Sequence, residues 1–319
     1  MSRRPNHKSK KINLGSVPHH PNEVHKIPLP EGVPNPPILG MFVGKRGQGK
    51  STAAVRLLHF YTNHKPEVFQ KELTFVISPT AESQQHLWDH IGVPEDNIYT
   101  SATPGEVRDV INNITSLLRA KKEKYDEEQE YLEALKALAN DEDLTPRQEY
   151  LLEKYQCEPL RDPEPWPRPM LLLDDLSHLK ILDKPWFVSL CLRHRHIAGG
   201  VSLSMLILCQ SLHGGLSRVV RQNCSLICLF TTHDKTCIDD LYKECSHLLN
   251  RNEFDAVFGH ATDDFHSFLA VDLSQKDPNR VFSRNFEHWY QIRNSHTLPP
   301  APKQEEFKPS DNSNLPSKS

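Results

Sequence analysis

The 319-residue chain lacks an apolar stretch long enough to cross a membrane. None of its apolar runs reaches the roughly 18–20 residues that a spanning helix requires, and the longest lie near Phe187–Leu192 and Met205–Cys209. The basic N-terminus is followed by no apolar segment, which excludes a secretory signal. We therefore expect an intracellular protein with no transmembrane segment.

Paired cysteines and a strong charge of either sign are also missing. The seven cysteines form no Cys-x-x-Cys pair, and two of them, Cys209 and Cys228, stand in apolar runs. This favours reduced, buried cysteines over a disulfide framework or a zinc site. The net charge is only −3, so any contact with DNA must come from a local basic surface.

Proline and charge mark the two ends of the chain. Residues 1–36 begin with a basic cluster and continue with many prolines, which predicts an extended or disordered arm in front of the fold. Its basic residues indicate either a solvated tail or a segment for DNA phosphates or nuclear import. Residues 291–319 are expected to form a disordered tail, which leaves one domain at 37–290. The basic residues of the arm are Arg3, Arg4, Lys8, Lys10 and Lys11.

Within this domain, apolar runs of the strand type alternate with helical patterns. This alternation predicts an α/β fold with a mostly parallel sheet and helices on both faces. Strands are expected at Ile38–Val43, Leu73–Ile77, Ile98–Thr100, Met170–Leu173, Ser202–Cys209, Ser225–Phe230 and Phe265–Val271. Helices are expected at Ser51–Tyr61, Glu82–Ile91, Pro185–Arg195, Leu216–Gln222, Cys237–Leu249 and Arg251–Phe258.

The segment at about 105–160 differs from the rest of the domain. It contains the charged run KKEKYDEEQE at 121–130, and leucines recur after it near a helical period. This pattern predicts a helical insertion or hairpin on the surface. The insertion is either a solvated structural element or a lid that contacts DNA or a partner.

A glycine-rich segment after the first strand fits the phosphate-loop pattern GxxxxGK[ST]. It reads Gly44-Lys45-Arg46-Gly47-Gln48-Gly49-Lys50-Ser51 and stands between a strand pattern and a helical pattern. Its glycines permit the torsions that let backbone N–H groups surround the β-phosphate, and the following helix points its positive end at the anion. Lys50 is expected to reach the β- and γ-phosphates of ATP, and the Ser51 hydroxyl to ligate Mg²⁺.

Polar side chains end two later strands. The run MLLLDDL at 170–176 ends in Asp174, expected to hold the Mg²⁺ shell through a water, and Asp175, expected to orient or deprotonate the attacking water. Gln210 ends the run at 203–210. It is either a contact to the γ-phosphate or the attacking water at the carboxyl edge of the sheet, or simply a polar strand end.

Further along the chain stand arginines that could complete such a site. An arginine can neutralise charge on the transferring phosphoryl group and can act in trans from a neighbouring subunit, although each can equally be a surface residue. The candidates are Arg193, Arg195, Arg218 and Arg221. The nearby His194 and His196 lack the carboxylate or cysteine spacing that a metal site needs.

The order of these motifs resembles one family. The phosphate loop GKRGQGKS is followed by MLLLDD, RHRHI at 193–197, LILCQS at 206–211, LSRVVRQN at 216–223 and HATDDFHSFLAVDL at 260–273. This order resembles the FtsK–HerA superfamily of DNA-pumping ATPases. Within it, the chain is most similar to the poxvirus-type genome-packaging ATPases of large double-stranded DNA viruses. The likeness covers about residues 37–290 and implies a RecA/FtsK–HerA-like P-loop NTPase fold.

The resemblance implies Mg²⁺-dependent ATP hydrolysis in a homo-oligomeric ring that moves double-stranded DNA, with a capsid or portal protein as a further partner. It gives Lys50, Ser51, Asp174, Asp175 and Gln210 the roles described above. For a viral protein it implies the host-cell assembly site, in cytoplasm or nucleus, and the virion. Arg195 and Arg221 fall in the arginine-bearing segments of the family and become the preferred trans-acting candidates.

The chain also departs from the family. The wider superfamily commonly has glutamate at the position of Asp175, and the charged segment at 120–160 matches none of the family's motifs. Two other functions remain open on the residues alone. One is a P-loop kinase that transfers a phosphoryl group to a small acceptor, and the other is an ATP-binding scaffold that hydrolyses ATP poorly.

Overall fold

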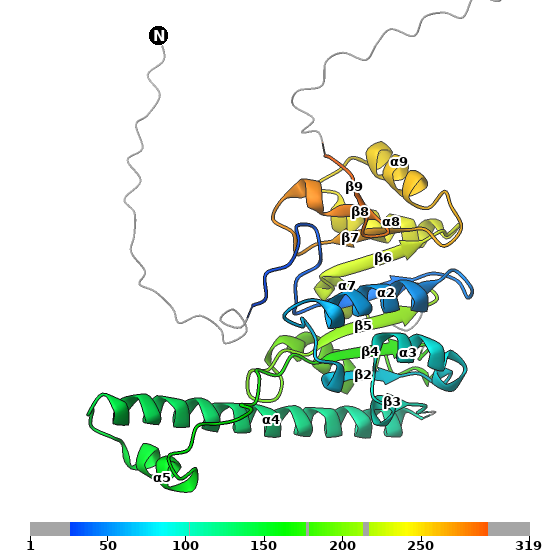
Figure 1. Cartoon of the computed structure of the whole chain (residues 1–319). Helices are drawn as coiled ribbons and strands as arrows, with labels where there is room; N and C mark the ends of the chain where they lie inside the picture. Colours follow the sequence, from blue (N-terminus) through cyan, green and yellow to red (C-terminus); the bar gives the residue numbers. More distant parts are fainter. Residues whose placement is uncertain (1–25, 102, 177–178, 213–216, 293–319) are drawn as a thin grey trace, which may run out of the picture.

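The computed structural model describes residues 26–101, 103–176, 179–212 and 217–292. Within them lies one sheet of nine strands in the order β3-β2-β4-β5-β1-β6-β7-β8-β9 (Figure 1). The strands from β3 to β6 in this order run parallel, and β7, β8 and β9 are antiparallel to their neighbours. The expected α/β fold with a mostly parallel sheet is confirmed.

The central strands β1, β2, β4, β5 and β6 coincide closely with the apolar runs because they are buried on both faces, as parallel strands under two helical layers must be. In chain order they are β1 Leu39–Val43, β2 Thr74–Ile77, β3 Ile98–Tyr99, β4 Met170–Asp174, β5 Ser204–Cys209, β6 Leu226–Phe230, β7 Phe268–Asp272, β8 Phe282–Arg284 and β9 His288–Trp289. The short strands β8 and β9 were not expected from the sequence.

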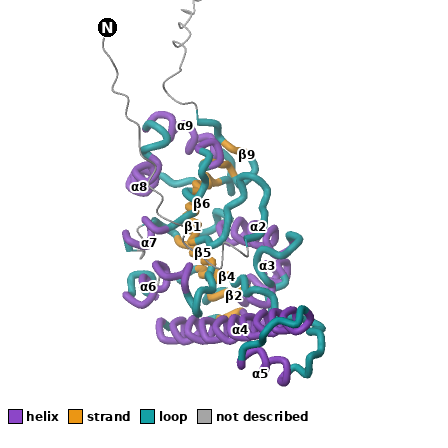
Figure 2. The backbone as a smooth tube through the Cα atoms, turned by 90° about the vertical axis from the view of Figure 1, so that its left-hand side faces the viewer, coloured by secondary structure: helices purple, strands orange, loops and turns teal. Residues whose placement is uncertain are grey.

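Helices cover both faces of the sheet (Figure 2). On one face, α2 and α3 pack with Ile38 and Phe42 in one apolar cluster, and on the other face α4, α6, α7, α8 and α9 share a second cluster with Leu39 and Met41. The helices are α2 Lys50–Asn63, α3 Gln85–Ile91, α4 Pro104–Ala139, α5 Pro146–Lys154, α6 Pro185–Arg193, α7 Arg218–Asn223, α8 Lys235–Cys245 and α9 Arg251–Ala261.

The insertion forms a helical arm. Helix α4 begins beside β3 and continues well past the sheet, and α5 packs against its far half (Figure 1). Both helices start with a proline behind a threonine capping box, at Thr103 and Thr145. A small apolar cluster, separate from the main core, joins them through Tyr131, Ala134, Leu151 and Leu152. The expected helical hairpin is therefore present, and its outer part has its own core.

The chain in front of β1 is more ordered than expected. The disordered arm was expected to reach residue 36, but residues 26–36 lie against the domain. Ile27, Leu29 and Val33 pack on the α2 cluster, and the Tyr61 hydroxyl donates to the Pro34 carbonyl at 2.5 Å. Proline content alone did not reveal these contacts. The rest of the arm, 1–25, and residues 293–319 of the tail lie outside the described residues.

The cysteines are free, and six of the seven are buried. Burial raises the pKa of the buried thiols, for example to about 12 for Cys191, Cys209 and Cys245. The expectation of reduced, buried cysteines therefore holds for all but Cys157, which is exposed after α5. Among the helices of the described residues, none is long and apolar enough to span a bilayer.

Candidate nucleotide-binding site

The glycine-rich segment joins the buried strand β1 to helix α2, as its sequence predicts. Gly44 donates its backbone N–H to the Cys209 carbonyl at 3.1 Å, which ties the start of the loop to β5. A Cβ at Gly44 would lie 2.6 Å from Gln48 Oε1 and 2.8 Å from Phe230 Cβ. Gly49 has φ of 90°, in the left-handed region that favours glycine. Glycine is therefore required at both positions, for space at Gly44 and for backbone conformation at Gly49.

Side chains of the loop hold it in shape. Gln48 Oε1 accepts the Lys45 N–H at 2.6 Å, and Gln48 Nε2 donates to the Thr231 carbonyl at 2.7 Å. The Lys50 ammonium donates to the Lys45 carbonyl at 3.1 Å, so the end of the loop is hydrogen-bonded to its beginning. Burial lowers the pKa of Lys50, although the charge of Asp174 opposes that shift. Lys50 thus stands over the hollow where phosphates would lie.

Ser51 and Asp174 meet although 123 positions separate them. The Ser51 hydroxyl donates to Asp174 Oδ2 at 2.8 Å. Burial raises the pKa of Asp174, while this hydrogen bond and the charge of Lys50 lower it. A hydroxyl and one carboxylate, completed by phosphate oxygens and water, form a donor set of the kind that Mg²⁺ takes in nucleotide sites. The two residues therefore fit the magnesium role expected for them.

Asp175 and Gln210 form a second pair at the same edge. Gln210 Nε2 donates to Asp175 Oδ1 at 3.4 Å. Asp175 has φ of 54°, so the backbone leaves the extended conformation of β4 directly after Asp174. Strand β5 lies between β4 and β1 in the sheet, so Gln210 at its end stands between the acids and the phosphate loop. Both side chains line the same cavity as the phosphate loop, and their role toward an attacking water stays a prediction.

These groups line one cavity of about 470 Å³. Two features identify the fold. The phosphate loop connects a buried strand to a helix, and a carboxylate on a nearby parallel strand accepts a hydrogen bond from the serine of that loop. The chain has the fold of a P-loop NTPase. The cavity is lined by Arg46, Gly47, Gly49, Lys50, Ser51, Thr52, Thr80, Ser83, Gln84, Leu87, Asp174, Asp175, Leu208, Cys209, Gln210 and His266.

A scan of protein-family models gives no match, and a search of curated proteins gives no relative. Solved structures similar to the chain include the genome packaging NTPase B204 from Sulfolobus turreted icosahedral virus 2 in complex with AMPPCP. It has 14% identity and a TM-score of 0.41, over 78% of this chain and 97% of that chain.

Two further solved structures are similar to the chain at a comparable level. The cytoplasmic domain of the Thermomonospora curvata type VII secretion ATPase EccC has 16% identity and a TM-score of 0.39, over 77% of this chain and 24% of that chain. The pCW3 conjugation coupling protein TcpA has 12% identity and a TM-score of 0.35, over 76% of this chain and 58% of that chain.

None of the candidate arginines lines the cavity at the phosphate loop of its own chain. Arg195 is exposed on the short turn His194–His196 after α6. Arg221 lies on α7, where it donates to the Leu212 carbonyl at 3.5 Å and pairs with Asp240 at 3.8 Å. Arg221 and Arg218 line a different cavity, between α7 and α8. Their role in trans stays a prediction.

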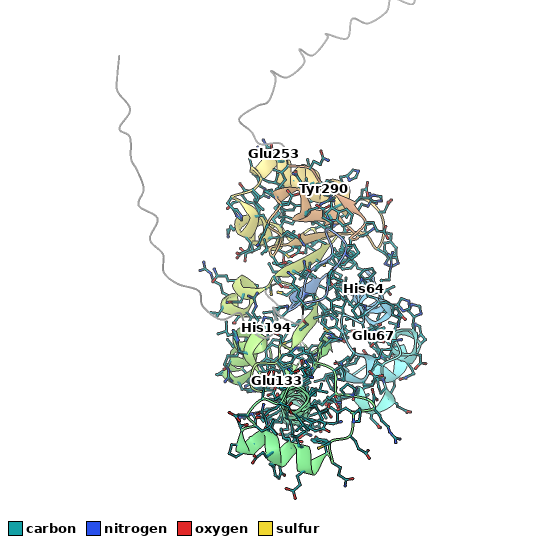
Figure 3. The ribbon with its side chains drawn as sticks, turned by 60° about the vertical axis from the view of Figure 1, so that its left-hand side comes forward. His64, Glu67, Glu133, His194, Glu253 and Tyr290 are labelled. Carbon is teal, nitrogen blue, oxygen red and sulfur yellow. The ribbon has the colours of Figure 1, made fainter. Side chains whose placement is uncertain are left out.

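His194 has a structural role in the described chain. It is buried on the turn after α6 (Figure 3), and its Nδ1 lies 3.0 Å from the Leu203 carbonyl, to which it must donate. Burial lowers the pKa of His194 from 6.5 to about 4. No cluster of three or more metal-ligating side chains occurs among the described residues. The histidine therefore stays neutral and supports the turn that carries Arg195.

This burial predicts a pH dependence of stability. Because the folded-state pKa of His194 is depressed, the unfolded chain binds more protons between about pH 6.5 and 4, and stability falls as the pH drops through that window. We expect a loss of about 3 kcal/mol in unfolding free energy from this group. His194→Asn, whose amide replaces the Nδ1 donor without titrating, should remove that part of the slope in urea unfolding. The exposed-site variant His247→Asn should retain it, and equal slopes in all three proteins would contradict the assignment.

His266 is one of the cavity residues that sequence reasoning missed as functional candidates. A Cβ at Gly49 would lie 3.1 Å from its Nδ1, so the imidazole stands directly beside the phosphate loop. Residues 265–271 within the segment HATDDFHSFLAVDL were expected to form a strand, and His266 was given no role of its own. Instead, β7 begins at Phe268 and the preceding residues form a loop at the site.

Proposed function

We propose that the protein is a Mg²⁺-dependent ATPase that translocates double-stranded DNA and packages a viral genome into its capsid. ATP hydrolysis is supported by one observation: Lys50, the Ser51–Asp174 pair and the Asp175–Gln210 pair line the same cavity. These are the parts that phosphoryl transfer to water requires: a cation on the phosphates, a magnesium site and groups that orient the attacking water.

Each residue has a separate task in this proposal. Backbone N–H groups of the phosphate loop hold the β-phosphate, and Lys50 offsets negative charge on the β- and γ-phosphates. Ser51 and Asp174 would hold Mg²⁺, which supplies charge neutralisation between the phosphates. Asp175 orients the water and accepts its proton, and the amide of Gln210 fixes the carboxylate of Asp175.

The step from an ATPase to a DNA motor rests on the order of motifs. That order supports a homo-oligomeric ring in which Arg195 or Arg221 reaches the neighbouring subunit's nucleotide. Both arginines lie outside their own chain's nucleotide cavity, which such an arrangement requires. In this proposal a capsid or portal protein is a further partner, and the protein acts at the host-cell assembly site.

The experiment that tests the proposal is ATP turnover by the full chain with and without long double-stranded DNA. We expect DNA to raise turnover severalfold, and a chelator of Mg²⁺ to abolish it. Turnover that is independent of DNA but rises with a small hydroxyl acceptor would favour the kinase alternative. ATP binding without turnover under any condition would favour the scaffold alternative. Either result would contradict the DNA motor.

A further inference from the structure

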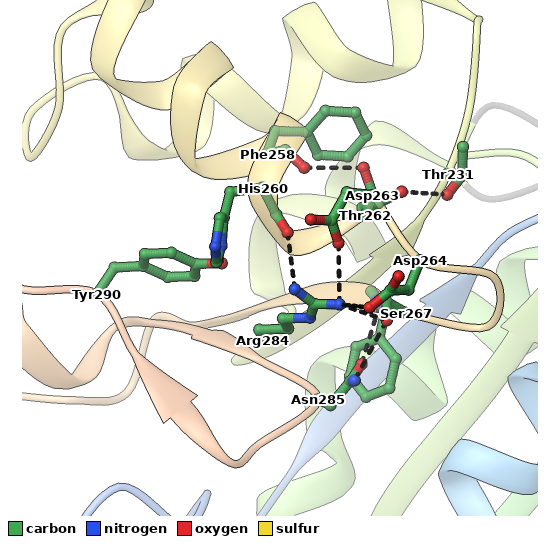
Figure 4. A network of polar contacts seen from close by, with 11 residues as sticks. Thr231, Phe258, His260, Thr262, Asp263, Asp264, Ser267, Arg284, Asn285 and Tyr290 are labelled. Carbon is green, nitrogen blue, oxygen red and sulfur yellow. Dashed lines mark hydrogen bonds and ion pairs between the residues drawn. The ribbon is translucent and has the colours of Figure 1, made fainter.

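The loop Thr262–Ser267 is fixed by a polar network centred on Arg284 of β8 (Figure 4). The guanidinium donates to the His260 carbonyl at 3.2 Å and pairs with Asp263 at 2.9 Å, and it also pairs with Asp264. From the other side, the Thr231 hydroxyl donates to the Thr262 carbonyl at 2.9 Å. An Arg-centred network of this kind gives the loop a defined shape.

At its tip the loop presents two aromatic rings beside the phosphate loop. The rings of Phe265 and His266 lie 4.0 Å apart between centroids, at 51°. Phe265 is 81% exposed, although it is a large apolar side chain. Both rings line a cavity of about 410 Å³ that adjoins Gln48 and Phe230. His266 also lines the nucleotide cavity, so the two hollows meet at this residue.

The sheet order shows which end of a nucleotide this second hollow would receive. Strands β5 and β4 lie on one side of β1 and carry Gln210 and the acids, so the γ-phosphate points to that side. On the other side lie β6 and β7, and the loop Thr262–Ser267 leads directly into β7. A nucleotide with its phosphates on Lys50 therefore extends its base away from the acids, toward Phe265 and His266.

We propose that the loop Thr262–Ser267 forms the nucleobase subsite, in which the base of ATP stacks on the rings of Phe265 and His266. This inference rests on the proposed function, because it requires a nucleotide in the phosphate loop. It explains why a large apolar ring remains exposed and why an Arg-centred network holds the loop. Stacking on an aromatic ring is favourable for any base, since every base has a π-face.

The test compares ligands with and without a base. Removal of the Phe265 ring in Phe265→Ala should weaken ATP binding roughly tenfold or more, measured by calorimetry with Mg²⁺ on the full chain. Binding of inorganic tripolyphosphate, which has the phosphates without the base, should change less than twofold. Phe265→Trp should restore ATP affinity. Tyr150→Ala, which removes an exposed ring from α5, is the matched control and should bind both ligands like the wild type.

The outcomes separate this inference from the proposed function. Equal ATP affinity of Phe265→Ala and the wild type would overturn the base subsite and leave the phosphate site intact. Equal weakening of ATP and tripolyphosphate would also overturn it, because the loop would then support only the phosphates. A wild-type protein that binds neither ligand would overturn the nucleotide site itself. Loss of DNA affinity in Phe265→Ala with unchanged ATP affinity would assign the ring to DNA instead.

Discussion

Lys50→Ala is expected to lower ATP hydrolysis by on the order of 100- to 1,000-fold, since it removes a fixed charge aimed at the transferring phosphoryl group. Lys50 stands in a partly buried site, where charge on the phosphates is screened less than in water. Its ammonium is already held over the loop by the Lys45 carbonyl at 3.1 Å. Little reorganisation is therefore needed when the phosphates arrive, and alanine cannot replace the lost charge.

The measurement is steady-state phosphate release at saturating ATP, with ATP binding measured separately. The control is Lys136→Ala, which removes an exposed lysine from helix α4 and should retain full turnover. Both variants should keep the thermal stability of the wild type, because neither lysine contributes to an apolar cluster. A Lys50→Ala protein with more than a tenth of the wild-type turnover would place the phosphates elsewhere.

Asp175→Asn should separate binding from chemistry. The substitution removes the group that orients and deprotonates water, and we expect hydrolysis to fall on the order of 100-fold or more. Asparagine adopts the left-handed region more readily than most residues, so the φ of 54° at this position should persist. Gln210 can still bond to the asparagine side-chain oxygen. ATP affinity should therefore stay within a few-fold of the wild type.

Single-turnover hydrolysis and equilibrium ATP binding, measured on the same preparation, test this expectation. Asp183→Asn is the matched control, since Asp183 is exposed in the segment after β4 and outside the cavity. If Asp175→Asn hydrolyses ATP at the wild-type rate, the water must be activated by another group. If it loses ATP affinity as strongly as Lys50→Ala does, Asp175 contributes to binding rather than to chemistry.

The sequence predicted those parts of the site that depend on local pattern. The phosphate loop is contiguous, so its glycines, Lys50 and Ser51 could be assigned directly. Asp174 and Gln210 could be placed because parallel strands end at the same edge of a sheet. What the sequence did not show is that β5 lies between β4 and β1, which places Gln210 beside Asp175.

Other features depend on contacts between distant segments, which no spacing in the sequence reveals. His266 reaches Gly49 across 217 positions, through a loop whose position is set by Arg284. The packing of residues 26–36 was hidden by their proline content, although proline is compatible with an extended chain held by side-chain contacts. The expected strand at Phe265–Val271 began too early because the apolar pattern of Phe265 and Phe268 does not distinguish an exposed loop ring from a strand.

The distribution of the cysteines allows the helical arm of α4 and α5 to be labelled selectively with a thiol reagent. A thiol reacts as its thiolate, so the six buried cysteines, with their raised pKa values, should resist alkylation in the folded protein. Cys157 is exposed just after the C-terminal end of α5, the short helix that packs on α4. A maleimide dye should therefore attach at one position without prior removal of other cysteines, and it would report on the surroundings of α4 and α5 while the buried cysteines of the P-loop domain stay unmodified.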